Sequence, residues 1–66
     1  MHYGKKIKIA RITADMNQSQ LAQKVGLQQA ALSKLEMGQR EITVSQLMEF
    51  AKALNVEAKD LLPDTE

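Results

Sequence analysis

The chain has 66 residues, no cysteine and one histidine, His2. This length leaves room for one domain, and the composition excludes a disulfide framework, a thiolate metal site and a multi-histidine metal site. The net charge of +1 conceals an asymmetry, because residues 1–40 carry seven basic and two acidic side chains whereas residues 41–66 carry two basic and six acidic ones.

The two parts therefore have net charges of +5 and −4. A basic half on a small domain favours a polyanionic partner, although a solvated charged face would give the same pattern. No apolar run approaches the roughly 20 residues needed to cross a bilayer, and the start "MHYGKKIKIA" lacks the features of a signal peptide. We therefore expect a soluble, cytoplasmic protein with no role in a membrane.

Apolar residues recur at helical spacing along nearly the whole chain, and no stretch alternates in the manner of a strand. The sequence predicts an all-α fold in a single domain, 1–66. The expected helices cover residues 4–14, 18–25, 28–37, 43–54 and 58–62.

Residue types at the helix ends support these ranges. Asn17 and Thr43 precede apolar helical patterns, and their side-chain oxygens can accept a hydrogen bond from a free amide of the first turn. Pro63 limits the last helix. Residues that tolerate the left-handed conformation of a helix stop follow the first four helices: Asp15, Gly26, Gly38 and Asn55.

The spacing within residues 18–37 is the most informative feature. Ala22 is small enough to let two helices cross closely, and Gly26 can adopt the backbone that a tight turn requires. Leu27 lies in the turn between the two helices, and the apolar positions of this stretch are Leu21, Val25, Leu27, Leu32 and Leu35. This pattern predicts a helix-turn-helix.

If Leu32 and Leu35 are buried, the opposite face of the third helix presents Gln28, Gln29, Ala30, Ser33 and Lys34. A glutamine amide can pair with both exposed edge atoms of adenine in the major groove, and alanine allows close approach to a thymine methyl group. Lysine can reach guanine or a phosphate. For the two glutamines, solvation at a helix start is the alternative interpretation.

The stretch "NQSQLAQKVGLQQAALSKLEMGQR" resembles the helix-turn-helix of the Cro and phage-repressor type, also called the XRE type, and the resemblance extends over residues 4–62. It implies a compact five-helix, lambda-repressor-like DNA-binding domain. Such a domain acts as a homodimer on a nearly palindromic operator in double-stranded DNA, with the third helix in the major groove.

Position by position, the resemblance implies that Gln18 binds a phosphate and helps to orient the third helix. It implies that Gln39 and Arg40 follow the sugar-phosphate backbone, and that Arg11 and Glu36 form a structural salt bridge. The side chains that it places against bases or flanking phosphates are Gln28, Gln29, Ala30, Ser33 and Lys34.

The first helix departs from the family pattern. Ala10 stands where leucine is usual, and Ile9 and Ile12 occupy positions that are commonly polar. We therefore expect either a rotated helix or an apolar strip exposed to a partner.

A sequence-specific transcription regulator is the leading functional prediction, with Val56, Leu61 and Leu62 as the dimer or partner face. A phage-type repressor, a restriction-modification controller and an antitoxin with a toxin partner all stay open. A protein-interaction module on the same scaffold is the alternative from another class. An enzyme is disfavoured, because Ser33 has no histidine near it in the pattern, and we expect no metal or other cofactor.

Overall fold

A computed structural model describes residues 3–62, which contain helices and no strand. The elements are α1 (Tyr3–Thr13), α2 (Gln18–Val25), α3 (Gln29–Glu36), α4 (Val44–Leu54) and the 3₁₀ helix η1 (Ala58–Leu61). The prediction of an all-α fold is confirmed, with one correction: the fifth element is a 3₁₀ turn and not an α-helix. Leu62 after it is extended (φ −74°, ψ 143°), because the residue before a proline is driven out of the helical region. Pro63 itself and His2 lie outside the described residues.

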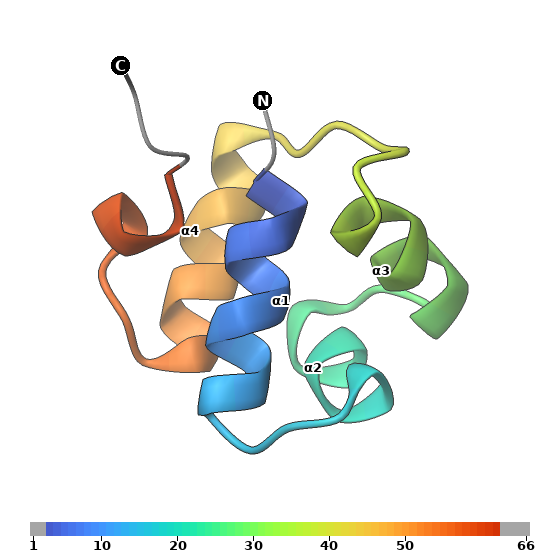
Figure 1. The fold of residues 1–66 in the computed structure, drawn as a ribbon, viewed down its shortest axis with the longest axis horizontal. Helices are drawn as coiled ribbons and strands as arrows, with labels where there is room; N and C mark the ends of the chain where they lie inside the picture. The colour runs from blue at the N-terminus through green and yellow to red at the C-terminus, as the bar shows by residue number, and fades with distance from the viewer. Residues whose placement is uncertain (1–2, 63–66) are drawn as a thin grey trace.

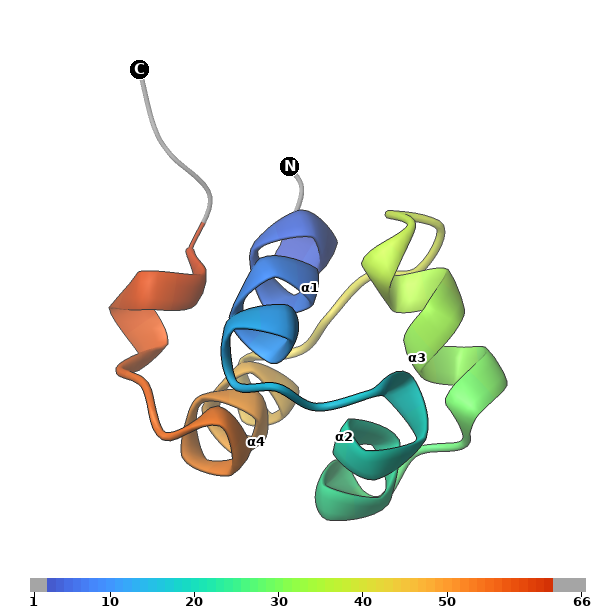
Figure 2. The ribbon, with the colours of Figure 1, turned by 60° about the horizontal axis from the view of Figure 1, so that its bottom comes forward.

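α1 crosses the middle of the fold, and every other element is arranged around it or around α4 (Figure 1). α1 packs against α3 on one side, against η1 on the other, and against α4 behind it. α2 packs against α3 and α4. α3 therefore lies at the edge of the molecule, next to α2, and one of its sides has no neighbouring element (Figures 1 and 2). None of the helices within residues 3–62 is long and apolar enough to cross a membrane.

The core draws side chains from every element. The largest fully buried ones are Phe50, Ile7, Leu21, Leu32, Leu35 and Leu61. Burying apolar area of this kind supplies most of the favourable free energy of folding in a domain of this size.

The burial of Leu61 contradicts the prediction that it lies on a dimer or partner face. We expected it on a dimer or partner face together with Val56 and Leu62, but its side chain has no exposed surface. The 3₁₀ turn points Leu61 into the contact between η1, α1 and α4, so only Val56, which is half-buried, and Leu62, which is 43% exposed, are accessible.

All four α-helices end in the same way. A residue with positive φ follows each helix, and the amide after it donates back to a carbonyl five residues earlier, as in the Schellman motif. These left-handed residues are Asp15 (φ 60°), Gly26 (72°), Gly38 (78°) and Asn55 (58°). The four predicted helix stops are confirmed.

Side chains close the starts of α2 and α4. Asn17 Oδ1 accepts from the amide of Gln20 at 2.8 Å, and the Gln20 side chain accepts from the Asn17 amide at 2.9 Å. Thr43 and Gln46 form the same reciprocal pair at 3.0 and 3.1 Å. Both predicted N-caps are confirmed, and each is a complete capping box.

Candidate nucleic-acid interface

The turn between α2 and α3 fixes how α3 is presented. Gly26 adopts φ 72° and ψ 29°, and the amide of Leu27 donates to the Ala22 carbonyl at 2.9 Å. Ala22 is 2% exposed and lies where a larger side chain would separate the two helices. Since Gln28 is extended (φ −78°, ψ 151°), the chain turns sharply into α3. Two short helices joined in this way form a helix-turn-helix (Figure 2).

α3 has one buried side and one exposed side. Leu32, Leu35 and Glu36 are buried. The opposite side, which we call the α3 face, consists of the residues predicted from the sequence: Gln28, Gln29, Ala30, Ser33 and Lys34. All are exposed except Ser33, which is half-buried.

The side chains of the α3 face have no internal partner. Gln28 does not cap the helix that it precedes, and Gln29, Ser33 and Lys34 make no side-chain hydrogen bond or ion pair with any other residue between 3 and 62. Gln20 and Gln46, by contrast, are both engaged in capping boxes. The amides of the α3 face are therefore free for an external ligand.

A buried ion pair holds the other side of α3. Arg11 Nε donates to Glu36 Oε2 at 2.7 Å and Arg11 Nη2 donates to Glu36 Oε1 at 3.2 Å. Both residues are less than 10% exposed. The salt bridge expected between the first and third helices is present, and its two-pronged geometry fixes the rotation of α3 about its axis against α1.

The same carboxylate reaches α2. Gln18 Nε2 donates to Glu36 Oε1 at 3.1 Å, and Arg11 Nη1 donates to the Met16 carbonyl at 2.8 Å. Arg11, Gln18 and Glu36 therefore connect α1, the loop before α2, the start of α2 and the end of α3. The expected contribution of Gln18 to the orientation of the third helix has a direct structural basis in this bond, while its contact with a phosphate stays a prediction.

Gly4 brings α1 against the end of α3. A Cβ at this position would overlap the Leu35 carbonyl oxygen and lie 3.0 Å from the backbone of Glu36. Only glycine allows the N-terminal turn of α1 to approach the backbone of α3 this closely. Sequence reasoning placed Gly4 at the helix start and missed this role.

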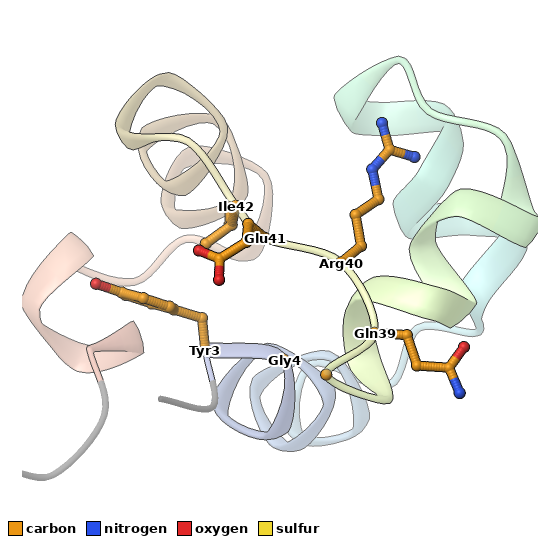
Figure 3. A pocket seen from close by; sticks show the side chains of 7 residues that line it. Tyr3, Gly4, Gln39, Arg40, Glu41 and Ile42 are labelled. Carbon is orange, nitrogen blue, oxygen red and sulfur yellow. The ribbon is translucent and has the colours of Figure 1, made fainter.

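The loop after α3 carries the two residues predicted to follow the DNA backbone. Gln39 and Arg40 are exposed and point away from Tyr3, on the side of α2 and α3 (Figure 3). The loop and the first turn of α1 enclose a hollow of about 390 Å³, lined by Tyr3, Gly4 and residues 38–42.

Every exposed charged side chain in residues 18–40 is positive. The only carboxylate in residues 18–40 is that of Glu36, which is buried and paired with Arg11. Lys24, Lys34 and Arg40 are exposed. A surface with this balance attracts a phosphate backbone, and no group of three or more potential metal ligands occurs anywhere in residues 3–62.

Two short helices joined by a tight turn, with an exposed polar face on the second helix, define the class of protein: a helix-turn-helix DNA-binding domain. The model of the helix-turn-helix family matches residues 7–61. The chain belongs to this family, in its Cro and phage-repressor, or XRE, branch of DNA-binding transcription regulators, which is not a family of enzymes.

Two known proteins are similar to this chain, one in sequence and one in structure. Over 64 residues, the chain is 33% identical to the control protein C.BamHI of Bacillus amyloliquefaciens, with 96% of this chain and 79% of that protein covered. The crystal structure of the restriction-modification controller protein C.AhdI from Aeromonas hydrophila superposes with a TM-score of 0.86 at 26% identity, with 92% of each chain covered.

Proposed function

We propose that this protein binds a specific DNA operator as a homodimer, reads it with the α3 face, and controls the transcription of a restriction-modification operon. The observation that supports the proposal most strongly is the α3 face itself. Its amide and ammonium groups have no side-chain partner among residues 3–62, while the network of Arg11, Glu36 and Gln18 holds the buried side of the same helix.

The composition of the α3 face matches the chemistry of base edges. Gln29 can form two hydrogen bonds with adenine, and Ala30 beside it leaves room for a thymine methyl group. Lys34, one turn further along, reaches guanine or a phosphate. Gln28 of this face, together with Gln18, Gln39 and Arg40 outside it, serves as a contact to phosphates, which set the register of the protein on the duplex.

The small size of α3 supports a homodimer. Eight residues span about 12 Å, which is on the order of four base pairs at about 3.4 Å each. One protomer therefore reads too short a sequence to be selective. Two protomers related by a two-fold axis double the site and place their recognition helices roughly 34 Å apart.

The exposed apolar residues of the C-terminal part supply a candidate dimer face. Leu62 is 43% exposed and Val56 is half-buried, and both flank η1. The acidic character of residues 41–66 disfavours contact with DNA there. A dimer joined through this region would leave both α3 faces free.

The role in a restriction-modification operon rests on the relatives. C.BamHI is named a control protein and C.AhdI a restriction-modification controller protein, and both match this chain over nearly its whole length. This similarity favours a controller over the phage-repressor and antitoxin roles that the sequence left open.

Selection of bound fragments from a random pool of DNA duplexes, with the full chain as the bait, tests the proposal. We expect a palindromic consensus whose half-sites lie about one helical turn apart. A reporter promoter carrying that consensus should respond to the wild-type chain and not to the Gln29→Ala variant. A pool that shows no enrichment would contradict sequence-specific binding, and an enriched site without two-fold symmetry would contradict the homodimer.

A further inference from the structure

α1 turns one side away from the rest of the protein, and this side combines charge with apolar surface. The positions lie three, four and seven residues apart, so they form one continuous stripe along about two helical turns. All four side chains are exposed, and we call them the α1 stripe: Lys5, Lys8, Ile9 and Ile12.

No other element packs on the α1 stripe. α3 and η1 flank α1 on opposite sides, and α4 lies behind it (Figure 1). Ile9 is 52% exposed and Ile12 is 58% exposed. Within residues 3–62, about half of the surface of each isoleucine therefore stays uncovered.

Both kinds of side chain are unfavourably placed in the isolated chain. Ile9 and Ile12 expose apolar surface to water. A concentrated patch of exposed apolar surface is typical of an interaction site. Lys5 lies in the first turn of α1, where the helix macrodipole disfavours a positive charge. Neither Lys5 nor Lys8 forms an ion pair with another described residue, and α1 contains no carboxylate.

We propose that the α1 stripe binds an acidic amphipathic helix of another protein. Carboxylates of that helix engage Lys5 and Lys8 at the N-terminal end of α1, and its apolar side chains cover Ile9 and Ile12 toward the C-terminal end. A helix is the natural occupant because the stripe is straight and an amphipathic helix presents apolar and charged positions at the same spacing.

A DNA backbone is a poorer occupant of this surface. Phosphates would pair with the lysines, but they offer nothing apolar to Ile9 and Ile12, which would stay next to hydrated backbone. The α1 stripe shares no residue with the α3 face. The inference therefore stands independently of the proposed DNA-binding function.

The test uses two synthetic helical peptides of about 18 residues, long enough to hold helical structure in solution. Both carry a leucine stripe, flanked by glutamates in one and by lysines in the other. Titration into the ¹⁵N-labelled full chain should shift amide resonances of residues 5–12, with the acidic peptide binding at least about tenfold more tightly than the basic one.

Two double variants and one control locate the site. Ile9→Ser/Ile12→Ser should weaken the acidic peptide about tenfold or more, and Lys5→Glu/Lys8→Glu should reverse the preference in favour of the basic peptide. Val44→Ser/Met48→Ser removes apolar surface of α4 that is at least as exposed (78% and 58%) and should leave both affinities unchanged. Circular dichroism checks that each variant is folded.

Four results would overturn the proposal. The first is equal affinity for the two peptides, and the second is resonance shifts confined to other helices. The third is loss of DNA binding in Lys5→Glu/Lys8→Glu while Ile9→Ser/Ile12→Ser leaves the affinity for the acidic peptide unchanged, which would assign the lysines to phosphates. The fourth is self-association of the wild-type chain that Ile9→Ser/Ile12→Ser abolishes, which would assign the stripe to a second copy.

Discussion

The carboxylate of Glu36 and the guanidinium of Arg11 meet in the interior, 25 residues apart in the chain, at 2.7 and 3.2 Å. Glu36 is on α3 and Arg11 is near the end of α1, so this pair links the α3 face to the rest of the domain. Gln18 adds a third group to the same carboxylate. The orientation of α3 therefore depends on a polar contact inside an otherwise apolar core.

Removing one partner of this ion pair should strongly destabilise the protein. Arg11→Met leaves a buried carboxylate without its cation, and the expected loss in the free energy of unfolding is about 3 to 5 kcal/mol. The double variant Arg11→Met/Glu36→Leu should recover much of that loss, because it removes both buried charges. Chemical denaturation of the two single variants and the double variant measures the coupling.

The exposed pair of Lys59 and Glu57 is the control. Its atoms are 3.8 Å apart and both side chains are more than 70% exposed, so Glu57→Gln should change stability by no more than about 0.5 kcal/mol. Equal effects of Arg11→Met and Glu57→Gln would contradict a structural role for the buried pair.

Gly4→Ala should destabilise the chain, although alanine is the better helix former. Helix propensity alone predicts a gain of up to about 1 kcal/mol, whereas the overlap with the Leu35 carbonyl should produce a net loss of about 1 to 3 kcal/mol. Thermal unfolding distinguishes the two signs.

Gly26 provides a comparison with a different physical basis. A Cβ there meets nothing within 4 Å, so only the left-handed backbone opposes substitution. Gly26→Asn should therefore be tolerated better than Gly26→Ala, while at Gly4 the larger side chain should always be worse. If Gly4→Ala raised the melting temperature, the close approach of α1 to α3 would be refuted.

Leu61→Ala and Leu62→Ala should act on different properties. Leu61 is fully buried, and its truncation should cost about 2 to 5 kcal/mol of folding free energy. Leu62 is exposed, so Leu62→Ala should leave the folding of the protomer nearly unchanged and weaken self-association. Denaturation and sedimentation equilibrium separate these effects; unaltered self-association in Leu62→Ala would remove this residue from the proposed dimer face.

Arg40→Ala should weaken binding to all DNA sequences alike. Arg40 is exposed in the loop after α3 (Figure 3), where it would neutralise a phosphate and release counterions. Its loss should lower the slope of log K against log salt by about 1 for each protomer. Titrations of specific and random duplexes at several salt concentrations measure this slope, and an effect restricted to the specific duplex would instead assign Arg40 to a base.

The sequence predicts those parts of the fold that depend on local chemistry. Asn17 and Thr43 cap helices because their side chains bond to amides three residues away, and Gly26 ends a helix because it tolerates positive φ. The exposed face of α3 followed from the positions of Leu32 and Leu35 alone. These features require knowledge of only one turn or one helix at a time.

The features of the fold that were not predicted depend on distances between helices. The roles of Gly4 and of the bond between Gln18 and Glu36 arise from how closely α1 and α2 approach α3. Helical periodicity does not predict the distance between two helices. Leu61 was misplaced because four residues of 3₁₀ helix are too short to show a periodic apolar face. The glutamines of the capping boxes carried a usable signal, since Asn17 and Gln20, like Thr43 and Gln46, have the spacing of that motif.

Fluorescence anisotropy of a labelled duplex carrying the selected consensus, titrated with the wild-type chain and with Gln29→Ala, tests the central claim that the α3 face reads DNA bases. Gln29 is exposed and its side chain has no partner in the described part of the chain, so its truncation should not affect folding. We expect a loss of about 1 to 3 kcal/mol in binding free energy on the consensus, with little change on a scrambled duplex. Unchanged affinity for the consensus would show that the α3 face does not read bases through Gln29.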